Sequence, residues 1–383
     1  MNNFEFHNPT KLIFGKGTIS NLDKLIAPEK KILLTYGGGS IKKNGVYDQV
    51  KKALKNHNVI EFGGIEPNPK YETLLKAVEL VKKENIDFLL PVGGGSVIDG
   101  TKFIAAAVKL DSDPWNILNG KAQIKAALPI GAILTLPATG TEMNGNSVIS
   151  KLATKEKYGF SSKYVYPVFS ILDPETCFSL PDIQIANGIV DAFVHVMEQY
   201  LTYPVNSPLQ DRMAESILIT LTEVGPKALK NKTDYNEMAN FMWCATMALN
   251  GAISRGVAED WTTHIIGHEL TALHEIDHAQ TLAVVLPGVM SVMRENKKEK
   301  ILQYGQRVWG VNSSNANTAI DETIAKTEQF FESMGIPTKL NKYSVGQDTI
   351  DTIVKRFTDR KSVFGEKGDV NPDAVRKILE IRK

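Results

Sequence analysis

The sequence predicts an α/β fold in two parts, an N-terminal domain built on a mostly parallel sheet and an all-helical C-terminal domain. The chain has 383 residues, which is enough for two domains with sizeable cores. Short apolar runs alternate with amphipathic stretches up to Pro181, and beyond that residue the strand-like runs stop. We therefore expect an α/β domain over residues 1–180 and a helical domain over residues 181–383.

The N-terminal half supplies the alternation on which this prediction depends. Two stretches have the 3.6-residue periodicity of helices, 71–83 and 97–108. Four short apolar runs between and around them are typical of buried strands: 31–36, 87–92, 130–136 and 168–172. Strands that alternate with helices favour a parallel sheet covered by helices on its faces.

The C-terminal half contains only helical patterns. Six segments have that periodicity, and most are separated by Gly, Pro, Asn or Ser: 182–200, 209–229, 236–249, 261–273, 298–309 and 318–334. We therefore expect this domain to be all-α.

Composition excludes several classes of protein. The net charge is +1 and 43% of residues are hydrophobic, which argues against a disordered chain and against a dedicated nucleic-acid binder. The two cysteines, Cys177 and Cys244, are too few for a disulfide framework. The N-terminal residues lack a secretory pattern, and no apolar run is long enough to span a membrane. We expect a cytoplasmic protein with neither nucleic acid nor membrane as its partner.

Glycine-rich turns follow two of the predicted strands. Gly37, Gly38, Gly39 and Ser40 follow the first, and Gly93 to Ser96 follow the strand that ends at Val92. Glycine lets a ligand approach the backbone, and the next helix offers N–H groups and its positive dipole end to a phosphate. Neither turn matches G-x-G-x-x-G, because Lys42 and Ile98 stand where the third glycine would fall. A tight turn without a ligand is the alternative interpretation.

A third polar turn, residues 137–142, follows the strand that ends at Leu136. The carboxyl ends of parallel strands share one edge of a sheet, where ligands of such folds bind. We expect the three turns to lie together there.

Histidines are concentrated in one segment of the helical domain. Four of the seven, His264, His268, His274 and His278, fall within residues 264–278. His264 and His268 are four residues apart on one helix face, and Asp191 and His195 repeat that spacing on another helix. A divalent metal held by a carboxylate and imidazoles needs such pairs from two or more helices.

The spacing does not fit a zinc protease. Ile265 follows His264 where H-E-x-x-H requires glutamate. After His268 the glutamate is present, but Ala272 stands in place of the second histidine. A metalloprotease is therefore disfavoured.

These motifs together resemble the iron-containing (group III) alcohol dehydrogenases, and within them the NADPH-dependent butanol dehydrogenases and broad-range aldehyde reductases. The resemblance covers essentially the whole chain. It includes the stretches NPTKLIFGKG, GGGSVIDGTKFIAAA, PATGTEMN, IANGIVDAFVHVMEQY and THIIGHELTALHEIDHAQTLA. The resemblance implies a Rossmann-like dinucleotide-binding domain, a helical metal-binding domain and a catalytic cleft between them.

The resemblance also implies roles for individual residues. It gives four metal ligands, Asp191, His195, His264 and His278. It places His268 beside the nicotinamide and substrate as a catalytic residue that relays a proton or positions the substrate, rather than as a ligand. His274 matches no functional position. The implied cofactor-binding residues, besides those of the first glycine turn, are Gly94, Gly95, Ser96, Asp99, Thr135, Thr139, Asn144 and Lys157.

The implied activity is hydride transfer between NADP(H) and a small aliphatic aldehyde or alcohol, mainly aldehyde reduction, with Fe²⁺ or Zn²⁺ as the metal. NAD-preferring members of the family place an aspartate near the position of Gly38, so glycine here favours NADPH. A homodimer is expected, because family members commonly pair through an N-terminal edge strand. A glycerol- or lactaldehyde-type dehydrogenase is the alternative within the superfamily. A metal-dependent hydrolase is a more distant one, because it would leave the glycine turns unexplained.

Overall fold

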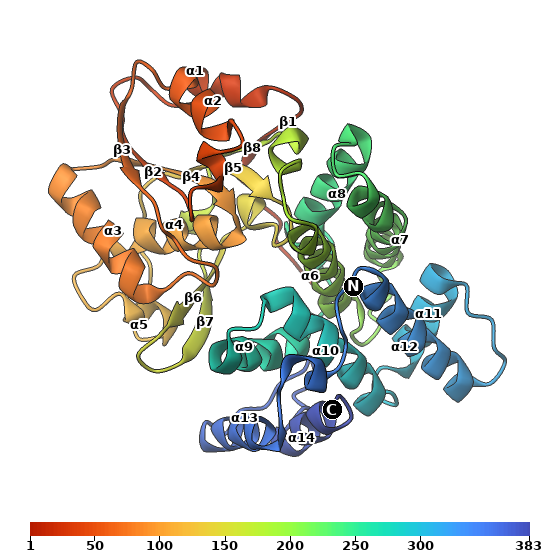
Figure 1. Ribbon diagram of the computed structural model, residues 1–383. Helices are drawn as coiled ribbons and strands as arrows, with labels where there is room; N and C mark the ends of the chain where they lie inside the picture. The colour runs from red at the N-terminus through yellow and green to blue at the C-terminus, as the bar shows by residue number, and fades with distance from the viewer. The chain divides into compact units, whose positions relative to one another are not determined.

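The computed structural model describes all 383 residues, which form two compact units (Figure 1). The sheet unit comprises His7–Pro181 and Lys232–Thr246. The helical unit comprises Met1–Phe6, Asp182–Asn231 and Met247–Lys383. The predicted boundary after residue 180 falls one residue before the main transition, but each unit also recruits a segment from the other side of it.

A six-stranded sheet forms the centre of the sheet unit, as the alternating pattern predicts. Its order is β1-β8-β5-β4-β2-β3, and every ladder is parallel. The strands are β1 (Lys11–Phe14), β2 (Lys31–Thr35), β3 (Asn58–Phe62), β4 (Phe88–Gly94), β5 (Gly131–Leu136) and β8 (Phe169–Leu172). The four predicted strands are β2, β4, β5 and β8, whereas β1 and β3 were not predicted.

Helices cover both faces of this sheet, because alternate residues of each strand point to opposite sides. Leu33 and Leu89 pack into the cluster that contains the helix residues Leu74 and Phe103. Their neighbours in the strands pack into a second cluster on the other face. The covering helices are α3 (Tyr71–Glu84), α4 (Gly95–Ala107) and α5 (Trp115–Leu118) on the first face, and α1 (Leu22–Leu25) and α2 (Val46–Ala53) on the second (Figure 1).

An antiparallel hairpin, β6 (Asn146–Lys151) and β7 (Glu156–Ser161), stands apart from the main sheet. Helix α8 (Tyr235–Ala248) packs with the sheet unit although it lies beyond Pro181 in sequence. Its Trp243 ring meets Phe14 of β1 edge-on, with centroids 6.1 Å apart. The hairpin and this placement of α8 are the main departures from the predicted architecture.

The helical unit contains eight further α-helices and none of the named strands. A core of Ile266, Val285, Ile353 and Ile378 joins four of them, α9, α10, α13 and α14. No helix combines the length and hydropathy needed to span a membrane. The helices are α6 (Asp182–Tyr200), α7 (Pro208–Lys230), α9 (Thr262–His274), α10 (His278–Val292), α11 (Lys298–Trp309), α12 (Ala316–Ser333), α13 (Gln347–Asp359) and α14 (Pro372–Glu380).

Helix α6 is the buried centre of this unit. Every residue from Ile185 to Tyr200 is buried, as expected of a helix that neighbours surround. Four polar residues nevertheless recur along it at intervals of three or four, which places them on one face: Asn187, Asp191, His195 and Glu198. Polar groups in such a helix require partners, and this stripe is where the candidate site lies.

Candidate metal and cofactor sites

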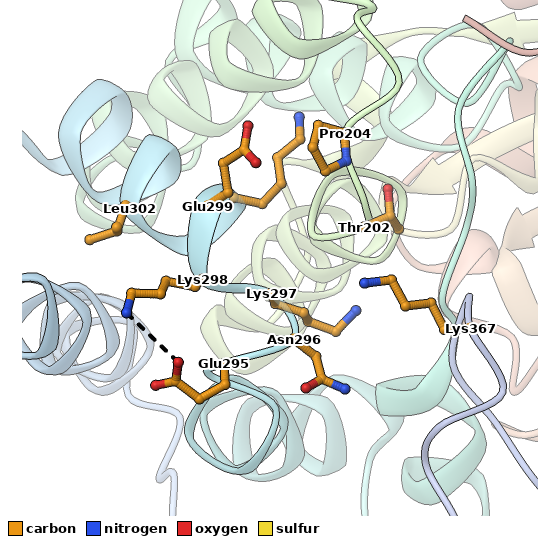
Figure 2. Close-up of a pocket in the computed structure, with 10 residues that line it drawn as sticks. Thr202, Pro204, Glu295, Asn296, Lys297, Lys298, Glu299, Leu302 and Lys367 are labelled. Atoms are coloured by element: carbon orange, nitrogen blue, oxygen red, sulfur yellow. Dashed lines mark ion pairs between the residues drawn. The ribbon is translucent and has the colours of Figure 1, made fainter.

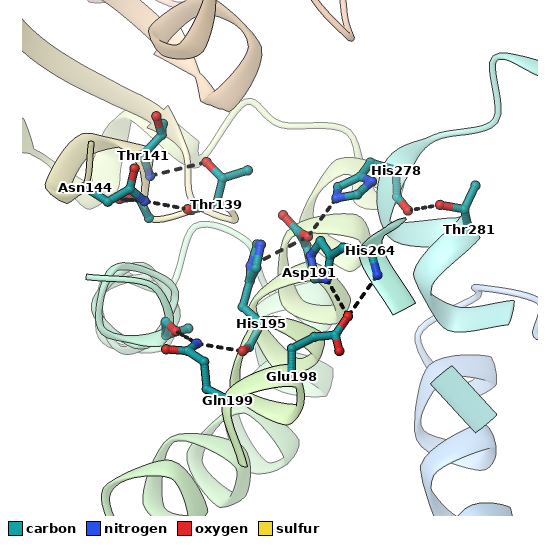
Figure 3. Close-up of polar contacts among 12 residues, drawn as sticks. Thr139, Thr141, Asn144, Asp191, His195, Glu198, Gln199, His264, His278 and Thr281 are labelled. Atoms are coloured by element: carbon teal, nitrogen blue, oxygen red, sulfur yellow. Dashed lines mark hydrogen bonds and ion pairs between the residues drawn. The ribbon is translucent and has the colours of Figure 1, made fainter. Parts of the chain in front are cut away.

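The polar stripe of α6 meets the histidines of α9 and α10, as Figure 3 shows. Ligand atoms of Asp191, His195 and His264 all lie within 4.8 Å of one another. The Oδ1 atom of Asp191 lies 3.7 Å from Nδ1 of His195 and 3.8 Å from Nε2 of His278. The structure therefore brings the four predicted ligands together from three helices.

Local structure fixes the direction of these side chains. The rings of His195 and His264 stack with centroids 4.7 Å apart. His278 is the first residue of α10, and the preceding Asp277 accepts a hydrogen bond of 2.8 Å from Asn187 of α6. That bond ties the start of α10 to the polar stripe.

The donor set fits a divalent transition metal. One carboxylate and three imidazoles suit Fe²⁺ and Zn²⁺. Two ligands about 2.1 Å from a tetrahedral metal are about 3.4 Å apart, close to the separations that Asp191 makes with His195 and His278. The side chains of Asp191 and His195 are each only 5% exposed, and a bound cation would offset the burial of the carboxylate.

His268 and His274 occupy different surroundings. The His268 ring lies beside the cluster, with its centroid 5.1 Å from that of His278 and 6.4 Å from that of His264. His274 points elsewhere, because its Nε2 lies 2.8 Å from Oγ1 of Thr349 on α13. The structure thus separates a histidine near the candidate metal from one with a structural contact.

Glu198 is a residue of this site that the sequence analysis did not single out. Its Oε1 accepts the backbone N–H of His264 at 2.8 Å and lies 3.0 Å from Nδ1 of the same ring. Burial, with a contribution from nearby Asp260, raises the pKa of Glu198 well above its usual range. The sequence spacing could have indicated Glu198, because it follows His195 by three residues and so lies on the same face of the helix.

In the sheet unit, the three polar turns lie side by side as predicted. Strands β5, β4 and β2 are neighbours and run parallel, so their carboxyl ends share an edge. A Cβ added to Gly37 would lie 3.6 Å from Val97, and one added to Gly95 would lie 2.8 Å from Thr139. These short distances join the first turn to the second and the second to the third.

The turn before α4 has the features of a phosphate site, although packing also explains its glycines. A Cβ on Gly94 would lie only 2.8 Å from the Leu136 side chain, so close packing requires glycine there. Gly94 is also the residue that precedes α4, and it has no side chain to cap the helix. The first N–H groups of this 13-residue helix are therefore available to an anion at its positive dipole end.

The first glycine turn is open at Gly38. A Cβ there would meet nothing within 4 Å, and the residue is exposed. The Lys42 ammonium has partners in the protein, because its Nζ lies over the Tyr36 and Tyr47 rings at 4.8 and 4.9 Å and pairs with Glu61 at 3.3 Å. The positive charge of Lys42 is therefore already partly offset by Glu61 and the two tyrosine rings.

Asp99 and Asn144 hold the third turn in place. The Asp99 carboxylate accepts hydrogen bonds from the Thr141 hydroxyl and, at 2.9 Å, from the Val148 backbone. The Asn144 amide donates to the Gly140 carbonyl at 2.9 Å. Both side chains are therefore used to shape the loop, and contact with a cofactor stays a prediction for them.

Lys102 of α4 organises the same loop and was not predicted. It is completely buried, and its Nζ donates to oxygen atoms of Thr141, Asn144 and Asn146 at 2.6–3.1 Å. Burial lowers the pKa of this amine to about 8. The Lys102 side chain thus stabilises the loop that contains the predicted cofactor residue Asn144.

Asn68 connects two further predicted residues. The Lys157 ammonium donates to Asn68 Oδ1 at 2.9 Å, and the Asn68 backbone N–H donates to Ser96 Oγ at 3.2 Å. Lys157 of the hairpin is therefore joined to the turn before α4. Thr135 is buried in β5, where its carbonyl lies 3.6 Å from the thiol of Cys177.

The helical unit also has a lysine-lined pocket of about 460 Å³ (Figure 2). Three of its four lysines pair with carboxylates: Lys297 with Asp260 and Glu366, Lys298 with Glu295, and Lys300 with Asp211. These pairings neutralise much of the positive charge, so the pocket is a poor candidate for an anion site.

Two family models match the chain. The model described as iron-containing alcohol dehydrogenase matches residues 9–174, and the C-terminal model of the Fe-containing alcohol dehydrogenase family matches residues 185–382. The chain is 52% identical to the NADPH-dependent aldehyde reductase YqhD of Escherichia coli (strain K12) over 99% of both chains. It is 38% identical to NADH-dependent butanol dehydrogenase A of Clostridium acetobutylicum over 100% of this chain and 99% of the relative.

Solved structures agree with these matches. The crystal structure of Escherichia coli K-12 YqhD superposes with a TM-score of 0.98 at 52% identity, covering 100% of this chain and 99% of that one. That of an NADH-dependent butanol dehydrogenase A from Thermotoga maritima gives 0.95 at 38% identity, with the same coverage.

Proposed function

Because the chain belongs to the iron-containing alcohol dehydrogenase family, we propose that it is a metal-dependent, NADPH-dependent reductase of small aliphatic aldehydes. The observation that carries this proposal is the buried convergence of Asp191, His195 and His264, with His278 beside them. The name of the 52% identical relative, an NADPH-dependent aldehyde reductase, supports both the cofactor and the direction of the reaction.

Asp191 and the three histidines would hold the metal. When bound, that metal would supply Lewis-acid polarisation of the substrate carbonyl, and a reduced nicotinamide would supply the hydride. The N–H groups at the start of α4, from Gly95 and Ser96, bind the pyrophosphate. His268, adjacent to His278, orients the substrate oxygen or a water molecule and transfers a proton to that oxygen.

The preference for NADPH rests on the first glycine turn. Relatives named for NADH and relatives named for NADPH both occur among the similar proteins, so family membership alone leaves the choice open. The open position at Gly38 leaves room for a 2′-phosphate, and Ser40 can donate a hydrogen bond to it. An acidic side chain at residue 38 would repel that phosphate.

A coupled assay tests the proposal. Butanal reduction is followed by the loss of reduced-nicotinamide absorbance before chelation, after chelation and after Fe²⁺ or Zn²⁺ is restored. We expect loss with chelator and recovery with metal. His278→Ala should lose both metal and turnover, whereas the matched variant His274→Ala should keep both, because His274 contacts Thr349 instead. Metal-independent turnover, or hydrolysis without NADPH binding, would reject the proposal.

Two further properties belong to the same proposal. We propose a homodimer that pairs through β1, which is an edge strand of the sheet and so has backbone groups available for pairing. Light scattering of the purified protein tests this. We also propose a cytoplasmic location, because Cys177 and Cys244 are both buried and form no disulfide. Cell fractionation tests that placement.

A further inference from the structure

We propose that Glu198 is the positioning residue that fixes the tautomer and ring direction of the metal ligand His264, an inference that rests on the proposed function. The carboxylate reaches His264 twice, at its backbone N–H and at ring Nδ1. Its side chain is only 3% exposed, so water does not readily replace either contact.

The arrangement selects one of the two imidazole tautomers. Oε1 of Glu198 accepts the backbone N–H of His264, so this oxygen acts as an acceptor and the ring nitrogen 3.0 Å away as the donor. With its proton on Nδ1, the ring presents the lone pair of Nε2 to a metal. A carboxylate hydrogen-bonded to the outer nitrogen also makes an imidazole a stronger ligand.

Glu198 is itself held in place by a buried ionic network. Its backbone carbonyl accepts the N–H of Asp260 at 2.9 Å. The Asp260 carboxylate pairs with Nζ of Lys297 at 2.5 Å, and Lys297 also pairs with Glu366 at 2.7 Å and donates to the Leu201 carbonyl at 2.7 Å. Lys297, Asp260 and Glu366 are each 3% exposed. This network fixes the backbone that aims the carboxylate at His264.

A second buried carboxylate on a neighbouring helix provides a matched control. Glu215 of α7 is also buried, but its Oε1 bonds with the Tyr200 hydroxyl at 2.7 Å and with Arg307 at 2.9 Å. None of its contacts involves the candidate ligands. A variant at this position therefore measures the general effect of changing a buried carboxylate in the helical unit.

The experiment measures metal affinity directly rather than activity. Apo protein of the wild type, Glu198→Gln, Glu198→Leu and Glu215→Gln is titrated with Co²⁺, and the ligand-field absorbance reports affinity and ligand geometry. Zn²⁺ competition then gives the affinity for Zn²⁺. Glutamine keeps an acceptor oxygen and leucine removes it, so we expect affinity to fall about 10-fold and about 100-fold respectively. The Co²⁺ spectrum should also change in both variants.

Glu215→Gln should lower the melting temperature yet leave metal affinity and the Co²⁺ spectrum unchanged. Equal Co²⁺ affinity in the wild type and Glu198→Leu would overturn the inference, as would an equal loss in Glu215→Gln. If Glu198→Leu fails to fold, the affinity and spectrum of Glu198→Gln decide. If the wild type itself binds no metal, the proposed function fails instead, so the two failures are distinguishable.

Discussion

His268 differs from its neighbouring histidines in what its loss should remove. It lies one turn beyond His264 on α9 and next to His278, but a fifth protein ligand would close the position that a substrate oxygen needs. We expect His268→Ala to keep its metal and to bind NADPH, while turnover falls about 10²-fold, the scale of a lost general acid. Metal analysis and single-turnover reduction of an aldehyde measure the two properties separately. Loss of the metal would identify His268 as a ligand.

A single substitution at Gly38 tests why the protein should prefer NADPH over NADH. Its backbone lies outside the left-handed region and a Cβ would have open space, so a side chain is tolerated. Gly38→Asp should reduce the preference for NADPH over NADH by about tenfold or more, because a carboxylate beside a phosphate costs at least about 1.4 kcal/mol. The neutral, isosteric Gly38→Asn is the control. Equal kcat/KM ratios in the two variants would contradict the charge argument.

Residue spacing indicated which candidate metal ligands share a helix face, but it did not indicate the contacts that support them. Asp191 and His195 are four apart on a helix, so their common face follows from helical geometry alone. The engagement of Asp99 with Thr141 and Val148 depends on where a distant hairpin packs, which no local pattern shows. The same holds for Lys102, the one cationic residue of α4, because its partners lie in the loop and hairpin of residues 141–146.

Helix α4 fixes the third polar turn through Lys102, so this one residue sets the shape of a whole loop. Lys102→Met would leave carbonyls of Thr141, Asn144 and Asn146 buried without their donor. We expect unfolding free energy to fall on the order of 3 kcal/mol and NADPH binding to weaken. The exposed Lys109→Met, just beyond the same helix, is the control. Unchanged NADPH affinity in a folded Lys102→Met protein would show that the loop does not serve the cofactor.

The contribution of Lys102 to the unfolding free energy should change with pH in a definite direction. The pKa of Lys102 is about 8 in the folded protein against an ordinary value of 10.5. Between these pH values the unfolded chain binds the proton and the folded chain does not, so the stability contributed by this group rises with pH. The unfolding free energy of the wild type relative to Lys102→Met should therefore grow from pH 8 to pH 10.5. Denaturant titrations at the two pH values measure the difference.

The central strands of the sheet were predictable from the sequence, and the edge strands were not. Strand β4 is buried on both faces and forms a continuous apolar run. Edge strands β1 and β3 are only partly buried: β1 has only four residues, and Glu61 interrupts the apolar run of β3. Helix α10 was not predicted, and it is apolar along most of its length and contains Pro287 in its interior.

The whole molecule divides into units that do not follow the order of the chain. Sequence order assigns α8 to the helical half, but its Phe241 and Ala245 are fully buried in the sheet unit. The Thr246 hydroxyl at its end donates to Glu142 Oε1 at 2.5 Å, in the third polar turn. Burial raises the pKa of Glu142, and the hydrogen bond from the Thr246 hydroxyl opposes that shift. The sheet unit is therefore incomplete without residues 232–246.

The need for residues 232–246 can be tested by expressing residues 7–181 alone. Without α8 the fragment exposes the apolar surface around Phe14 and leaves Glu142 buried without the Thr246 hydroxyl. We expect it to bind a hydrophobic dye, to associate, and to bind NADPH weakly, because exposed apolar patches favour association. A synthetic peptide of residues 232–246 added in trans should recover part of the NADPH affinity, whereas a scrambled peptide should not. If the fragment alone were monomeric and bound NADPH as tightly as the full chain, residues 7–181 would be an independent domain and α8 would be dispensable to it.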